Sequence, residues 1–169
     1  MRTYFKWLDE NNDPGTGLWR KGTYPTKGSI CQHMGDGFHF LFTYEHAKMP
    51  YPNADRLIDT CLFMYRGKKL YPKFAEQFHF IEMDWVFCLN RASRQTKYRF
   101  DEIKHALSDH AKKYVGWLYT VDWENDDGAN DLHMLFGTLC CLAELQLALP
   151  GIIRSDVPMR MALDRRPFI

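Results

Sequence analysis

The chain has 169 residues, of which 46% are hydrophobic and 25% are charged, and its net charge is +1. This length fits one domain with a sizeable core, and the composition excludes disordered, collagen-like and disulfide-scaffold proteins. A charge so near zero gives no reason to expect nucleic acid as a partner. The five cysteines form no C-x-x-C pair, which is typical of free thiols in a reducing compartment, so we predict a cytoplasmic protein. The longest uncharged run, around Cys140 and Cys141, is too short to span a membrane.

Helical periodicity, without strand alternation beyond a few residues, predicts an all-α protein. In chain order, the expected helices cover 1–11, 36–48, 53–66, 80–95, 99–119 and 130–149. We expect Asp36 to be the N-cap of the second helix, and Asn130 or Asp131 to be that of the sixth. The prolines at Pro50 and Pro150 are expected to end these same two helices.

Exposed and buried helices are expected to alternate along the chain. The helices 53–66 and 99–119 are amphipathic and should face water, whereas 130–149 is apolar nearly all round and should be buried. Shifting the chain by 46 positions sets His33 on His79, and a repeat of this length is typical of stacked helical hairpins. We therefore expect one helical domain over 1–153, followed by a C-terminal tail over 154–169.

Acidic residues are concentrated in one window of the chain. Residues 114–153 contain no Lys or Arg and six acids: Asp122, Glu124, Asp126, Asp127, Asp131 and Glu144. The window either has a function of its own or includes a solvated loop, since loops are usually polar.

One short motif suggests a family. Trp7 and Leu8 are followed by Asn12 and then by Gly17 and Trp19. This pattern resembles the aromatic-Leu-x3-Gln-x3-Gly-x-Trp motif of terpenoid cyclases, a superfamily that includes the prenyltransferase toroids. Here Asn stands at the Gln position, and the spacer before the glycine is one residue longer. In that superfamily the motif ties an outer helix to the following turn.

The resemblance implies an α/α toroid, in which inner and outer helices alternate around a central pocket. Six-hairpin glycosidases and polysaccharide lyases share this architecture, so the fold alone leaves both a glycan and a terpenoid substrate open. A closed toroid of about six hairpins needs roughly twice this length. We therefore expect a partial or reduced toroid of about three hairpins, whose open edge exposes apolar surface and favours a homodimer.

In such toroids the pocket lies at the starts of the inner helices, and the sequence places three ionisable clusters there. The clusters are His33, Asp36 and His39; then His79, Glu82 and Asp84; then Asp126, Asp127, Asp131 and His133. Helix capping would explain the acids, but it does not account for the histidines. Four aromatic residues are expected at the same rim and could stack on a sugar ring or an isoprenoid: Trp19, Tyr24, Trp85 and Trp123.

Three kinds of chemistry are compatible with these candidates. Asp84 and Asp131 could form the carboxylate pair of a glycoside hydrolase. His79 or His133 could serve as the base of a lyase, with Tyr24 or Tyr44 as the acid. The run from Glu124 to Asp127 resembles the Asp-x-Asp-Asp motif of cyclases, in which the middle acid donates a proton.

No cofactor is expected, because phosphate-binding and dinucleotide-binding glycine motifs are absent from the sequence, as are zinc-type His/Cys clusters. Weak calcium binding by residues 122–127 remains open. The sequence thus favours an enzyme acting on a glycan or an isoprenoid-like molecule. The alternative is a non-catalytic helical repeat module that binds a partner protein or a carbohydrate on its concave face.

Overall fold

The structure is a computed structural model that describes residues 2–19 and 29–164. These residues form six α-helices, a short 3-10 helix and no strand, which confirms the all-α prediction. The helices are α1 (Arg2–Asn11), α2 (Ile30–Ala47), α3 (Ala54–Arg66), α4 (Phe80–Ser93), α5 (Phe100–Leu118), α6 (Leu132–Ala148) and η1 (Ala162–Asp164). No described helix is long and apolar enough to cross a membrane.

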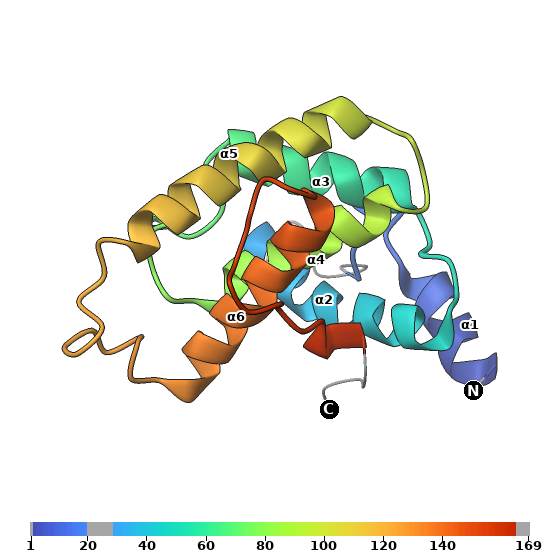
Figure 1. Ribbon diagram of the computed structural model, residues 1–169. Coiled ribbons are helices and arrows are strands. Elements are labelled where there is room, and N and C mark those ends of the chain that lie inside the picture. Colours follow the sequence, from blue (N-terminus) through green and yellow to red (C-terminus); the bar gives the residue numbers. More distant parts are fainter. Residues whose placement is uncertain (1, 20–28, 165–169) are drawn as a thin grey trace.

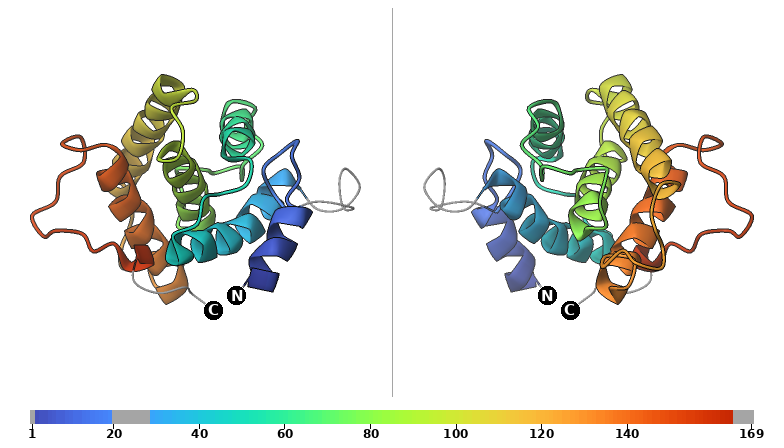
Figure 2. Two further views of the ribbon diagram at one scale, coloured as in Figure 1. Left: turned by 90° about the vertical axis from the view of Figure 1, so that its right-hand side faces the viewer. Right: turned by 90° about the vertical axis from the view of Figure 1, so that its left-hand side faces the viewer.

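Helix α4 is the centre of the molecule, and every residue from 81 to 92 is buried. Helices α2 and α6 flank α4, while α3 and α5 cover it (Figure 1). In the side views of Figure 2, α1 and α2 lie on one side of α4, and α5 and α6 lie on the other. A helix surrounded in this way buries all its faces, so the charged residues of α4, Glu82, Asp84 and Arg91, are buried together with its apolar ones.

Helix α2 begins six residues earlier than its sequence predicts. Ser29 is the N-cap: its side chain accepts a hydrogen bond from the Gln32 backbone, and the Gln32 side chain accepts one from the Ser29 backbone. This reciprocal capping box satisfies donors that the first turn leaves free. The expectation that Asp36 caps the helix is therefore wrong, because Asp36 lies within α2.

Helix α6 is less buried than its apolar sequence predicts. Three leucines at seven- and eight-residue spacing lie on an exposed face: Leu132 is 83% exposed, Leu139 59% and Leu147 44%. The helix packs on α4 and α5. It lies at the edge of the helical array, so its outer face stays open.

The turn after α1 is fastened by side chains of the Trp7–Trp19 motif. The Asn12 side-chain amide donates to the Gly17 carbonyl over 2.9 Å, and the Trp19 indole donates to the Leu8 carbonyl over 2.8 Å. Gly17 has φ of +72°, and a Cβ there would lie 2.5 Å from the Leu57 backbone nitrogen. Only glycine fits this close approach between the turn and α3.

A buried ionic network joins α2, α4, α6 and η1. The Arg91 guanidinium pairs with Glu144, which is fully buried, and also with Glu45 and Asp164. The Asn90 side chain donates to the same Glu144 carboxylate over 2.7 Å. Hydrogen bonds to carboxylates raise the pKa of Arg91, against the effect of burial. Because Leu163 is also buried, the chain returns to the core at η1.

Candidate functional site

A pocket of about 450 Å³ opens where the first halves of α2 and α4 meet the start of α6. Four sequence-derived candidates line it: Asp36, His39, Asp84 and His133. Asp36 and His39 share one face of α2, because residues three apart on a helix are neighbours. The tertiary structure therefore brings together one or two members of each predicted cluster.

Asp84 is the most unusual of these residues, because its carboxyl lines the pocket although the residue is only 3% exposed. Burial raises the pKa of Asp84 well above its ordinary value, and the nearby Glu82 and Asp36 carboxylates raise it further. Among the described residues, no hydrogen bond holds this carboxyl. A neutral carboxyl in this setting has a proton to donate to a ligand.

Gly35 leaves space beside Asp84. A Cβ at position 35 would lie 3.2 Å from the Asp84 Oδ2 atom, which is closer than an ordinary contact. Gly35 is also part of the pocket wall. A side chain at this position would therefore crowd the Asp84 Oδ2 atom.

Glu82 lies between two residues of the pocket wall, Ile81 and Met83, but does not itself line the pocket, and it has a different role. It is fully buried, its Oε1 atom accepts a hydrogen bond from the Ala75 backbone over 3.1 Å, and its Oε2 atom has no partner among the described residues. Burial raises the pKa of Glu82 to about 8. Ala75 has φ of +73°, so the Glu82 hydrogen bond holds a residue in the left-handed region within the loop before α4.

His79 is the N-cap of α4, because its Nδ1 atom accepts a hydrogen bond from the Ile81 backbone over 3.1 Å. Capping therefore does account for one histidine, contrary to the expectation from sequence. The neutral ring carries its proton on Nε2, since Nδ1 is the acceptor. Burial and the nearby His133 lower the pKa of His79. The His79 ring lies 4.5 Å from that of Tyr71, a residue of the pocket wall.

The remaining ionisable candidates lie outside the pocket wall. Asp131 is the exposed N-cap of α6 and accepts a hydrogen bond from the Met134 backbone over 3.0 Å, as predicted for this position. Asp127 is exposed in the preceding loop. His33 is half-buried on α2 and is not among the residues that line the pocket.

The tryptophans expected at the rim have structural positions instead. Trp85 is fully buried, and its indole donates to the Cys61 carbonyl over 3.0 Å. Trp19 packs on Phe40 at 5.0 Å between ring centroids. Trp123 is 52% exposed and packs edge-on against Phe78, away from the pocket. These three tryptophans therefore do not line the pocket and cannot stack on a ligand bound there. Tyr24, the fourth aromatic residue expected at the rim, lies outside the described residues.

Tyr44, considered above as the acid of a lyase, is also fully buried, and its hydroxyl donates to Asp9 over 2.5 Å. The aromatic residues of the pocket are Phe38, Tyr71 and Phe80. His133 stacks on Phe80 at 5.7 Å between ring centroids. Phe38 and Phe80 directly adjoin predicted histidines in sequence, which is a signal that could have indicated them. Tyr71 comes from a loop without a motif.

The acidic loop before α6 uses several of its carboxylates to organise its own turns. Asp122 accepts hydrogen bonds from the Glu124 and Asn125 backbone, and Asp126 accepts them from Gly128 and Ala129. Within the described part of the chain, no group of three or more acidic, His or Cys side chains could hold a metal ion.

Comparison with protein-family models, with curated proteins and with solved structures finds no match to this chain. The function proposed below therefore rests on the geometry of the pocket.

Proposed function

We propose that the pocket between α2, α4 and α6 is an acid–base site for a small uncharged, glycan-like substrate. The observation that carries this proposal is the Asp84 carboxyl, which lines the pocket, is 3% exposed and has a raised pKa. A carboxyl whose pKa is raised by burial holds its proton to higher pH, which suits it to protonate a departing oxygen atom.

The partner groups of this chemistry come from the other two helices. In hydrolysis, Asp84 would give its proton to the glycosidic oxygen, while His133, His39 or Asp36 would accept a proton from the attacking water. The imidazole rings suit this role because histidine is the side chain that most often acts as a general base in enzymes. His133, stacked on Phe80 at the start of α6, is our first choice for the base.

The lining of the pocket favours a sugar over an isoprenoid diphosphate. The described residues of the wall include no Lys or Arg, so there is no cation to balance a diphosphate. Tyr71, which is 38% exposed, and the half-buried Phe80 offer aromatic surface for the apolar face of a sugar ring. A volume of about 450 Å³ lies within the range of small-molecule sites. An uncharged polyene protonated by Asp84 is the terpenoid alternative.

We further propose that the helix pairs α1–α2, α3–α4 and α5–α6 form an arc of an α/α toroid. Two observations support this arrangement. Helices α2, α4 and α6 are neighbours, as inner helices of a toroid would be. The Asn12 and Trp19 hydrogen bonds fasten α1 to the following turn, which is the role that the resembling motif has in terpenoid cyclases.

The test uses a panel of neutral oligosaccharides with a reducing-end label, incubated with the wild-type chain and with Asp84→Asn. We expect the wild type to cleave at least one member, and Asp84→Asn to lose at least 100-fold in rate, since a general acid contributes about 10²–10⁴-fold. Asp131→Asn is the matched control, because it makes the same change in a cap outside the pocket and Asn also caps helices.

Gly35→Ala provides a second variant that leaves every ionisable group in place. The added methyl group would crowd Asp84 Oδ2, so turnover should fall at least tenfold while the fold is kept. Gly116→Ala is its control, because a Cβ at that position of α5 meets nothing within 4 Å. Equal activity of wild type, Asp84→Asn and Gly35→Ala would refute the proposed acid.

A second candidate is a non-catalytic module that binds a partner protein. The exposed leucines of α6, Leu132, Leu139 and Leu147, favour it, because a row of apolar side chains on one helix face is typical of a contact surface. In this case Leu139→Glu would abolish association, and Asp84→Asn would leave it unchanged.

A further inference from the structure

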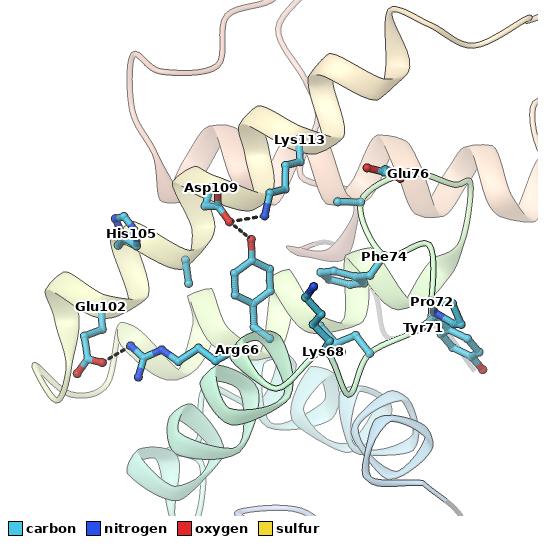
Figure 3. A pocket seen from close by; sticks show the side chains of 14 residues that line it. Arg66, Lys68, Tyr71, Pro72, Phe74, Glu76, Glu102, His105, Asp109 and Lys113 are labelled. Carbon is cyan, nitrogen blue, oxygen red and sulfur yellow. Dashed lines mark hydrogen bonds and ion pairs between the residues drawn. The ribbon is translucent and has the colours of Figure 1, made fainter.

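A second cavity lies between α3, the loop 67–76 and α5 (Figure 3). Its volume is about 600 Å³, and it shares only Tyr71 with the pocket described above. Figure 3 shows the side chains of Arg66 and Lys68 along one wall, with those of Asp109 and Lys113 opposite. We call this cavity the α3–α5 groove.

The acids of the α3–α5 groove that lie on α5 already have cationic partners. Glu102 pairs with Arg66 and Arg99, which lower the pKa of its carboxyl to about 2. Asp109 accepts hydrogen bonds from Lys113 over 2.7 Å and from the Tyr65 hydroxyl over 2.5 Å, and both lower its pKa. These carboxylates are therefore not available to neutralise further cations.

Several cations of the groove loop have no such partner. Lys68 lines the groove, and Lys69 and Lys73 are exposed on the same loop. Among the described residues none of these three lysines forms an ion pair. Glu76 is the only acid between residues 60 and 80 of the sequence. The groove thus has an excess of positive charge on its loop side, which attracts an anionic partner.

The floor of the groove is aromatic. The Tyr65 and Phe74 rings lie 6.2 Å apart at an angle of 74°, and Tyr71 is 38% exposed at one end. Aromatic walls beside lysines suit a segment that carries both an aromatic side chain and acids.

The chain itself contains a segment of this chemistry, the acidic loop 122–131. Asp122, Glu124, Asp127 and Asp131 are exposed there, and Trp123 among them is 52% exposed. No Lys or Arg occurs between residues 114 and 153, and within the described residues none of these acids forms an ion pair. Figure 1 shows this loop projecting beyond the end of α5, where a neighbouring molecule could reach it.

We propose that the α3–α5 groove is the docking surface for the acidic loop 122–131 of a second copy of this chain. The acids of the loop would face Lys68, Lys69 and Lys73, and Trp123 would enter the aromatic floor. Two copies related by a two-fold axis could exchange loops reciprocally, so the contact would close as a dimer. This proposal does not depend on the acid–base function of the other pocket.

The test is sedimentation velocity of the full chain over a range of concentrations, at 50 mM and 500 mM salt. We expect a dimer at low salt whose dissociation constant rises at least tenfold at high salt, because exposed charge pairs are screened. Lys68→Glu and Asp127→Lys should each weaken the dimer at least tenfold. The double variant Lys68→Glu/Asp127→Lys should recover most of this loss, since it restores opposite charges across the contact.

Lys97→Glu is the matched control, an exposed lysine outside the groove, and it should leave the dissociation constant unchanged. Three results would overturn the proposal: a monomer at all concentrations in low salt, a dimer insensitive to Lys68→Glu, or a double variant as weak as the single ones. Association that persists in high salt and disappears in Leu139→Glu would assign the contact to α6 instead.

Discussion

Single residues in this protein owe their chemistry to burial more than to their immediate sequence neighbours. Asp84 and Glu82 are both fully or almost fully buried on α4, but only Asp84 lines the pocket. Glu82 instead hydrogen-bonds the Ala75 backbone and holds the adjoining loop. Two carboxyls two residues apart thus have different surroundings. For this reason we propose Asp84 as the acid and give Glu82 a structural role.

Glu82 makes the stability of the fold depend on pH in a defined direction. Its folded pKa of about 8 lies above its ordinary value of 4.5, so the folded state holds the proton more tightly than the unfolded chain. The contribution of this proton to the free energy of unfolding is complete below about pH 4.5 and is lost as the pH rises towards 8. The free energy of unfolding falls by at most about 1.4 kcal/mol per pH unit in this range.

Glu82→Gln should remove this dependence while it keeps the acceptor for Ala75. Urea denaturation of both proteins at several pH values measures the difference between their free energies of unfolding. We expect the free energy of unfolding of the variant to rise relative to that of the wild type as the pH increases from 5 to 8. Two parallel stability profiles would show that Glu82 does not titrate in this range.

At the scale of helices, the capping residues decide where elements begin. The apolar pattern predicted α3, α4 and α5 to within two residues at each end, because their periodicity is strong and local. For α2 the apolar pattern suggested a start at Asp36, whereas the helix starts after Ser29. The signal was the Ser-x-x-Gln capping box, which is also local but does not depend on apolar periodicity.

The N-cap assignment of α2 gives a direct test at this scale. Ser29→Ala should lower the free energy of unfolding by about 1 kcal/mol, because it removes the hydrogen bond to the Gln32 backbone. Asp36→Ala should cost less, since Asp36 lies in the interior of the helix on an exposed site. Thermal denaturation followed by circular dichroism measures both, and a larger loss for Asp36→Ala would contradict the assignment.

For the whole molecule, the Arg91 network connects elements that are distant in sequence. Arg91 on α4 reaches Glu45 on α2, Glu144 on α6 and Asp164 on η1. This network ties the later halves of α2, α4 and α6 together, while the acid–base pocket lies at their beginnings. The two polar sites are therefore separated along the same three helices.

Arg91→Leu should destabilise the protein by about 3–5 kcal/mol, because it leaves the Glu144 carboxylate buried without a counter-charge. Arg91→Leu/Glu144→Leu should recover most of this loss, since an apolar pair of similar size avoids the buried charge. Urea denaturation of the two variants provides the comparison. A double variant no more stable than Arg91→Leu would show that the network acts through Glu45 or Asp164.

The sequence by itself determined the helical class, the approximate helix bounds and the identity of Asp36, His39, Asp84 and His133 as candidates. These follow from local periodicity and from where ionisable residues fall relative to helix starts. Only the tertiary structure decided which candidates meet: it placed Trp85 in the core, Asp131 at an exposed cap and Glu82 behind the pocket wall. It also left one face of α6 open, although the helix is apolar nearly all round. The reason is that local periodicity shows which face of a helix is apolar, whereas which helices meet is decided by contacts between segments far apart in the chain.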